Sequence, residues 1–231
     1  MKVQRLRFRY SLRAAAADLG QRELAAAWEH ACMVAALPLA YSGGKRPSPL
    51  ISIAAPLPQG VTSDCELLDL VLSERIQPPD VLVQIGPQLP SGIHPSAVGE
   101  VGVSAPSLQS QVRWAEYEVR VRGLDPELVQ QSLCRVLEAT TMPAEYQREK
   151  KVRTYDLRPL IIALDLCAVA EGEAVISMRL RAAPERTARA DQVASALGLP
   201  DERRIHRTRL VLEEVPPAVL AYRRLNGGDD A

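Results

Sequence analysis

The stretch Leu39-Ala40-Tyr41-Ser42-Gly43-Gly44-Lys45-Arg46-Pro47-Ser48-Pro49-Leu50-Ile51-Ser52 separates a long helical pattern from the strand pattern that follows it. Its two adjacent glycines permit positive φ and a close approach of backbone N–H groups to a ligand. Two cations come next, and two prolines stiffen the turn. Such a turn can hold an anion such as a phosphate. A solvated helix-to-strand connection explains the same residues, so both interpretations stay open.

The first predicted strand lies upstream, over residues 3–10. Leu6, Phe8 and Tyr10 alternate with three arginines, and a period of two indicates a strand with one buried face. The arginines on the other face are consistent with a functional basic surface or with a merely solvated one. These arginines are Arg5, Arg7 and Arg9.

The first hundred residues predict the order β-α-β-β-α-β. A helix capped by Asp18 is expected to run to about Ala36, before Leu37-Pro38. The other expected elements are strands near 50–54, 65–72 and 93–103 and a helix over 80–89. This order is that of the ferredoxin-like split βαβ unit, which we place at residues 1–104.

A second unit of the same kind is predicted over residues 111–215. Its first helix begins at Asp125-Pro126-Glu127, a cap, an N1 proline and a first-turn acid. The other expected elements are strands at 112–121, 174–181 and 205–213, a hairpin near 147–153, an apolar segment at 155–169 and a helix at 191–197. Residues 216–231 form a tail expected to be disordered. The predicted fold class is therefore α+β, with two tandem ferredoxin-like (βαββαβ) units.

The strands of the second unit predict a platform of mixed charge. Acidic side chains share the outward positions with the arginines, so a partner protein or a phosphate backbone would suit this face equally. The predicted outward arginines are Arg120, Arg122, Arg179, Arg181, Arg207 and Arg209, and the acids are Glu116, Glu118 and Glu213. The open sheet faces lack the set of stacking aromatics that an RRM carries, and Trp114 is the main candidate for stacking on a base.

Composition sets further bounds. The 231 residues carry no net charge, which argues against a general polyelectrolyte binder, although local basic faces remain possible. The four cysteines stand singly in apolar surroundings, which predicts buried, reduced thiols and a cytoplasmic protein. The N-terminus has no apolar signal core, and no apolar run is long enough to cross a membrane. No Walker A, GxSxG, HExxH or cysteine cluster occurs, so we expect no catalytic residue, no metal and no cofactor.

Several motifs resemble the radical SAM-linked family, a domain of unknown function found beside or fused to a radical SAM protein. The residues that carry the resemblance are Gln4–Tyr10, Leu37–Ser42, Arg148–Lys150, Asp156–Leu160 and Arg204–Thr208. The resemblance implies a radical SAM protein as partner. The layout is also similar to that of the CRISPR repeat-processing endoribonucleases, which are tandem ferredoxin-like RNA binders.

These observations lead to a hypothesis of binding rather than catalysis. The protein is predicted to be a non-catalytic accessory module of a radical SAM protein that binds RNA or presents a substrate. A protein-binding scaffold and a ribonuclease-like RNA-processing enzyme are the alternatives. The predicted binding residues are Arg5, Arg7, Arg9, Tyr41, Ser42, Gly43, Gly44, Lys45 and Arg46.

Overall fold

The computed structural model describes residues 1–148, 151–170 and 172–213. The predicted tail at 216–231 lies outside them. The first half contains four strands and two helices in the predicted order. They are β1 (Gln4–Leu12), α1 (Gln21–Val34), β2 (Ile51–Ile53), β3 (Thr62–Leu72), α2 (Pro78–Ile85) and β4 (Ile93–Val101).

The second half follows a short connecting helix, α3 (Leu108–Gln111). Its main elements are β5 (Val112–Arg122), α4 (Pro126–Glu138), β8 (Ile161–Ala170), β9 (Glu173–Ala183), α5 (Ala190–Ala196) and β11 (Arg204–Leu212). The predicted hairpin is present as β6 (Pro143–Arg148) and β7 (Lys151–Asp156), and a short β10 (Arg186–Thr187) follows β9.

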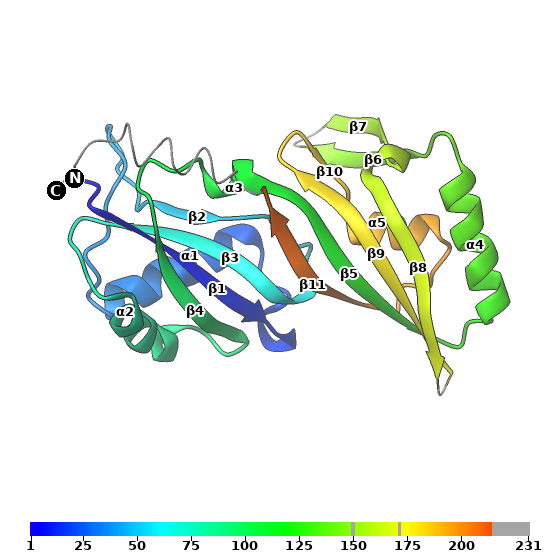
Figure 1. The fold of residues 1–231 in the computed structure, drawn as a ribbon, viewed down its shortest axis with the longest axis horizontal. Coiled ribbons are helices and arrows are strands. Elements are labelled where there is room, and N and C mark those ends of the chain that lie inside the picture. Colours follow the sequence, from blue (N-terminus) through cyan, green and yellow to red (C-terminus); the bar gives the residue numbers. More distant parts are fainter. Residues whose placement is uncertain (149–150, 171, 214–231) are drawn as a thin grey trace.

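The strands of the first half pair in the order β4-β1-β3-β2, and every pair is antiparallel. The strands of the second half pair in the order β11-β5-β9-β8, again with every pair antiparallel. The halves lie side by side and meet where β11 pairs with β3 (Figure 1). That pairing is parallel and short, with His206 opposite Thr62 and Arg207 opposite Ser63. The result is an α+β fold with one large, mostly antiparallel sheet of nine strands and, among the described residues, five α-helices.

The core of the first half follows from the alternation in β1. Leu6, Phe8 and Tyr10 are all fully buried. The rings of Phe8 and Tyr10 make T-shaped contacts with Trp28 on α1, with centroid distances of 5.4 and 5.2 Å. Edge-to-face contacts of this kind add to the stabilisation that apolar burial provides. The predicted inward face of β1 is therefore confirmed.

The helix starts are partly as expected. Asp125 caps α4 and accepts a hydrogen bond from the Glu127 backbone N–H at 2.9 Å, which confirms the predicted cap. The predicted Asp18 cap is wrong, because α1 begins two residues later with Gly20 as its N-cap. There the Glu23 carboxylate accepts from the Gly20 backbone N–H at 2.8 Å. A carboxylate in the first turn meets the unpaired N–H groups of a helix start, so a glycine suffices at the cap.

One prediction about the platform is also wrong. Arg207 was expected to face outward with Arg209, but it is 2% exposed and lies inward with Ile205. A register shift in β11 falls between Arg207 and Arg209. An extra residue in one strand of a pair reverses which positions face the core, so a strict period of two fails across it.

Candidate functional site

The glycine–cation loop projects from the sheet on a stiff stem. The Ser42 N–H donates to the Ser48 carbonyl at 2.8 Å, the Ser48 N–H donates to the Ser42 hydroxyl at 3.0 Å, and Tyr41 pairs with Pro49. Gly44 has a φ of +109°, a conformation that an L side chain rarely adopts. All residues from Gly43 to Ser48 are exposed, and Lys45 and Arg46 form no ion pair within the part of the chain that the structure describes.

The stem joins the sheet near the start of β1. The Ala40 N–H donates to the Val71 carbonyl at 2.8 Å, and the Val71 N–H donates to the Leu50 carbonyl at 3.0 Å. Val71 is in turn the register partner of Arg5. The loop and Arg5 therefore belong to the same end of the first half, one strand apart, whereas Arg9 pairs with Leu67 farther along β3.

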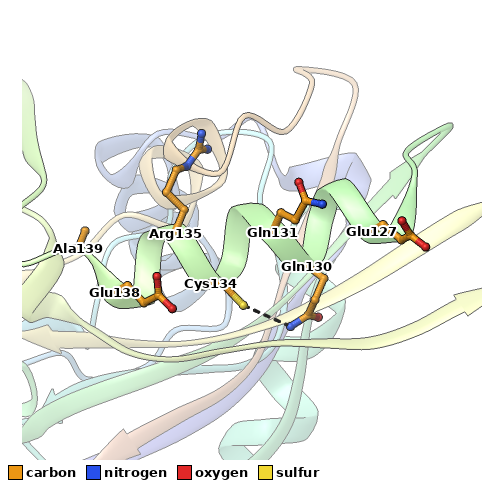
Figure 2. Close-up of a pocket in the computed structure, with 7 residues that line it drawn as sticks. All are labelled: Glu127, Gln130, Gln131, Cys134, Arg135, Glu138 and Ala139. Atoms are coloured by element: carbon orange, nitrogen blue, oxygen red, sulfur yellow. Dashed lines mark hydrogen bonds between the residues drawn. The ribbon is translucent and has the colours of Figure 1, made fainter.

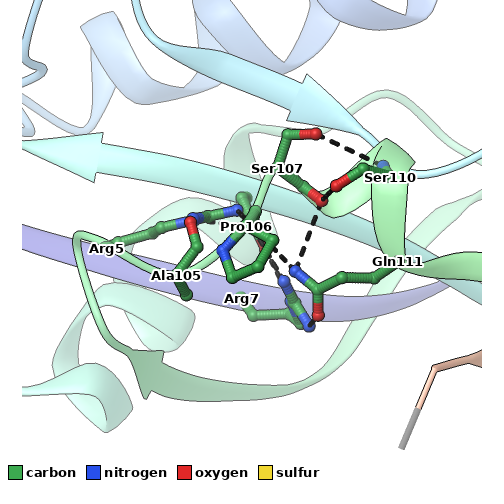
Figure 3. Close-up of polar contacts among 8 residues, drawn as sticks. Arg5, Arg7, Ala105, Pro106, Ser107, Ser110 and Gln111 are labelled. Carbon is green, nitrogen blue, oxygen red and sulfur yellow. Dashed lines mark hydrogen bonds and ion pairs between the residues drawn. The ribbon is translucent and has the colours of Figure 1, made fainter. Parts of the chain in front are cut away.

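Two of the three β1 arginines are occupied within the protein. Arg5 is 7% exposed and donates through Nε to the Asp69 carboxylate at 2.8 Å and through Nη1 to the Ala105 carbonyl at 2.8 Å. Arg7 donates to the other Asp69 oxygen at 2.8 Å. The segment between the halves thus crosses the outer face of β1, and Gln111 holds it there by donating to the Pro106 carbonyl (Figure 3).

Arg9 differs from its two neighbours, since it is exposed and no ion pair occupies it among the described residues. The predicted binding residues therefore separate into two groups. Arg5 and Arg7 anchor the connecting segment, while Arg9 and the loop cations remain open to solvent. An exposed, unpaired guanidinium or ammonium can engage an anion without first giving up an internal partner.

A buried ion pair joins the two halves. Arg207 on β11 donates to the Glu66 carboxylate on β3 at 2.9 Å, and both side chains are 2% exposed. Arg207 also donates to the Tyr117 hydroxyl at 3.0 Å and to the Ala55 carbonyl at 3.2 Å. Burial alone would lower the pKa of Arg207, but the Glu66 carboxylate and Tyr117 outweigh it and raise that pKa. The guanidinium therefore stays charged.

A groove of about 1180 Å³ opens above this ion pair. Its walls come from both halves, since the turn at 54–58 belongs to the first half and residues 182–192 belong to the second. Tyr155 of the β6–β7 hairpin also lines it and donates from its hydroxyl to the Gln192 side chain. The run Pro56-Leu57-Pro58 gives no indication in the sequence that it forms one wall of a groove.

A second polar cluster lies where β11 meets β3. His206 contacts the Thr62 hydroxyl through Nδ1 at 2.7 Å and the Asp64 carboxylate through Nε2 at 3.0 Å. Arg13 pairs with the other Asp64 oxygen at 2.7 Å. The hydrogen bond with His206 lowers the pKa of Asp64. Because His206 belongs to one half and its partners to the other, this cluster links the halves on the outer side of the sheet.

The three carboxylates of β3 that form these contacts were not identified from the sequence. Asp64, Glu66 and Asp69 all lie on β3, and Glu66 and Asp69 are each 1% exposed. A charged residue inside an apolar strand is rarely buried without a partner. Their presence in the run Thr62–Leu72 was therefore a signal that opposite charges lie on neighbouring strands.

The outer side of α4 carries a shallow hollow that includes Cys134 and is lined mainly by residues of polar type (Figure 2). Cys134 and Cys167 are exposed, so the expectation that all four thiols are buried is wrong. Cys32 and Cys65 are buried, and burial raises the pKa of Cys32 to about 12 and that of Cys65 to about 11. Cys134 lies on the helix surface that faces away from the packed residues Val129, Leu133 and Val136, which period-3.6 spacing places on the other side.

The described residues contain neither a metal-binding cluster nor a membrane-spanning helix. No three His, Cys, Asp or Glu side chains in that part of the chain are arranged to hold a metal ion. Among the same residues, no helix has the length and apolar character needed to span a bilayer.

Comparisons with known proteins place the chain in a family. No curated protein matches it. Among solved structures it is similar to a chain in "Crystal Structure of a Cbf5-Nop10-Gar1 Complex", at 9% identity and a TM-score of 0.45. That match covers 96% of this chain and 57% of the other, so this protein spans little more than half of that chain. A family model described as "Uncharacterized protein conserved in bacteria (DUF2344)" matches residues 5–190. The chain therefore belongs to this DUF2344 family of conserved bacterial proteins.

Proposed function

We propose that this protein is a non-catalytic module that binds RNA, or presents an RNA substrate, for a separate radical SAM protein. The radical SAM partner rests on the sequence resemblance given above. The strand orders β4-β1-β3-β2 and β11-β5-β9-β8 support the idea that the module consists of two ferredoxin-like units.

The observation that carries the proposal is the exposed glycine–cation loop. Lys45 and Arg46 stand beside two glycines on a stem that is fixed by hydrogen bonds between Ser42 and Ser48. A fixed stem lowers the entropy that a ligand must overcome when it orders the loop. Two unpaired cations beside exposed backbone N–H groups suit a phosphate backbone.

The proposal is tested by measuring the affinity for a fluorescein-labelled single-stranded RNA at several salt concentrations. The wild type is compared with a Lys45→Glu/Arg46→Glu variant. Phosphate contacts make log K fall with log salt by about 0.7 for each contact to a single strand. The variant is expected to bind more weakly and to have a slope that is smaller by about 1.4 for two lost contacts.

The matched control is Arg22→Glu/Arg135→Glu. These two cations are exposed on α1 and α4 and form no ion pair among the residues described, so the control makes the same change in net charge. It should bind like the wild type. The proposal would be contradicted if the RNA affinity of the wild type did not change with salt concentration, or if the Lys45→Glu/Arg46→Glu variant bound RNA as well as this control. Co-purification of a protein without RNA from the native host would favour the scaffold alternative.

A further inference from the structure

Trp114 occupies an outward position on β5. The alternate residues Ala115, Tyr117 and Val119 are buried in the core, whereas Trp114 is only partly buried. Its register partner on β9 is Arg181, which is exposed. Side chains directly opposite each other in antiparallel strands lie about 5 Å apart at Cβ. An indole ring and a free guanidinium therefore lie next to each other on the open side of the sheet.

The same side of the sheet carries an excess of positive charge. Six arginines and three glutamates occupy outward positions of β5, β9 and β11, which leaves three positive charges over. Asp165 on the neighbouring β8 reduces the surplus to two. The arginines are Arg120, Arg122, Arg179, Arg181, Arg204 and Arg209, and the glutamates are Glu116, Glu118 and Glu173.

The arginines on this face are more exposed than the glutamates that pair with them. Glu116 pairs with both Arg179 and Arg209, at 3.0 and 4.0 Å, and those two arginines are 49% and 64% exposed. Arg181 has no ion-pair partner in the described part of the chain. Arg181 can therefore engage a phosphate without displacing a carboxylate. A guanidinium group has five N–H donors, so Arg179 and Arg209 can also donate to a phosphate while they pair with Glu116.

We propose that this outward face of β5, β9 and β11 binds single-stranded nucleic acid. One base stacks on Trp114, and Arg179, Arg181 and Arg209 hold the phosphates on either side of it. The inference rests on the proposed RNA-binding function and adds a second contact surface to the loop at 43–46. It goes beyond charge alone because the aromatic ring lies inside the basic region, which is how sequence-tolerant single-strand sites are built.

A folded protein partner fits this face less well. Apart from Trp114, only Val175 and Val211 supply large apolar side chains at the outward positions of these three strands. The centre of a protein interface is depleted in charged residues, whereas this face is mostly guanidinium and carboxylate. A phosphate backbone matches guanidinium geometry through paired N–H donors.

The experiment uses the full chain and a fluorescein-labelled unstructured oligouridylate. The Trp114→Ala variant loses one stacked base and is expected to bind the RNA roughly 5- to 150-fold more weakly. The Trp114→Phe variant should keep part of the affinity. Arg181→Glu should lower the salt slope by about 0.7. Arg22→Glu makes the same charge change on α1 and should leave the affinity and slope unchanged.

A second measurement needs no variant. Trp28 is fully buried, so acrylamide quenching of the native protein reports on Trp114. The oligouridylate should protect the fluorescence from acrylamide. Salt-dependent RNA binding that is unaffected by Trp114→Ala and Arg181→Glu, with no protection from acrylamide, would overturn this inference and leave the proposed function standing. Absence of RNA binding by the wild type would overturn both, and binding of a protein in place of RNA that requires Trp114 would overturn this inference.

Discussion

Replacing Arg207 with methionine is expected to destabilise the protein strongly. The change leaves the buried Glu66 carboxylate with no opposite charge beside it, and it removes the donors to Tyr117 and to two backbone carbonyls. Removing one partner of a buried ion pair costs about 3–5 kcal/mol of unfolding free energy. For a chain of this size such a loss lowers the melting temperature by about 6–20 °C.

This effect is measured by equilibrium unfolding in urea, with circular dichroism and tryptophan fluorescence as the two probes. Because Arg207 and Glu66 lie on strands from different halves, both probes should shift together. The double variant Glu66→Leu/Arg207→Met restores an uncharged, filled site and should be more stable than the sum of the two single changes by at least about 2 kcal/mol.

The control is Arg209→Met, two residues along the same strand. Arg209 is 64% exposed and lies 4.0 Å from Glu116, so its replacement should change the stability by less than about 1 kcal/mol. The reasoning would be refuted if Arg207→Met cost no more than this control, or if the double variant showed no coupling between the two sites.

Three further outcomes are expected. The Asp64→Asn variant should lose less stability in acid than the wild type, as measured by urea unfolding at several pH values. The folded pKa of Asp64 lies below the unfolded value near 4, so the contribution of Asp64 to the unfolding free energy is complete above about pH 4 and is lost as the pH falls through the lower folded pKa. The same pH profile in variant and wild type would count against this prediction. In native protein at mildly alkaline pH, iodoacetamide should modify Cys134 and Cys167 quickly and spare Cys32 and Cys65, as peptide mass spectrometry would show, and rapid labelling of Cys32 would contradict its burial. The Gly92→Ala variant should be less stable by about 1–3 kcal/mol in the same urea assay, because φ is +93° and a Cβ would lie 2.8 Å from the Ala16 nitrogen. In the control Gly43→Ala the new Cβ meets nothing within 4 Å, so the stability should hardly change. Equal effects of the two substitutions would argue against the steric explanation.

Several elements of the fold could be read from local patterns. The alternation in β1 predicted its buried face, and Asp125-Pro126-Glu127 predicted the start of α4. The projecting loop was also recognisable from two glycines followed by two cations and prolines. These features depend on residues a few positions apart, so the sequence alone specifies them.

The fate of the charged residues could not be read in this way. Arg5 and Arg7 had the alternation of an open basic face, yet Asp69 and the segment near Ala105 occupy them. Arg207 was expected to share the outward side of Arg209, but a register shift separates the two residues and Arg207 lies inward beside Glu66. In each case the partner lies more than 60 residues away in the sequence.

The sequence by itself therefore determined the order of the elements and the inward face of most strands. Only the tertiary structure decided which cations are neutralised inside the protein and which stay free for a ligand. The physical reason is that hydrophobic periodicity is a short-range property of the chain. The partner of a buried charge is instead set by strand register, which arises only when distant segments pair.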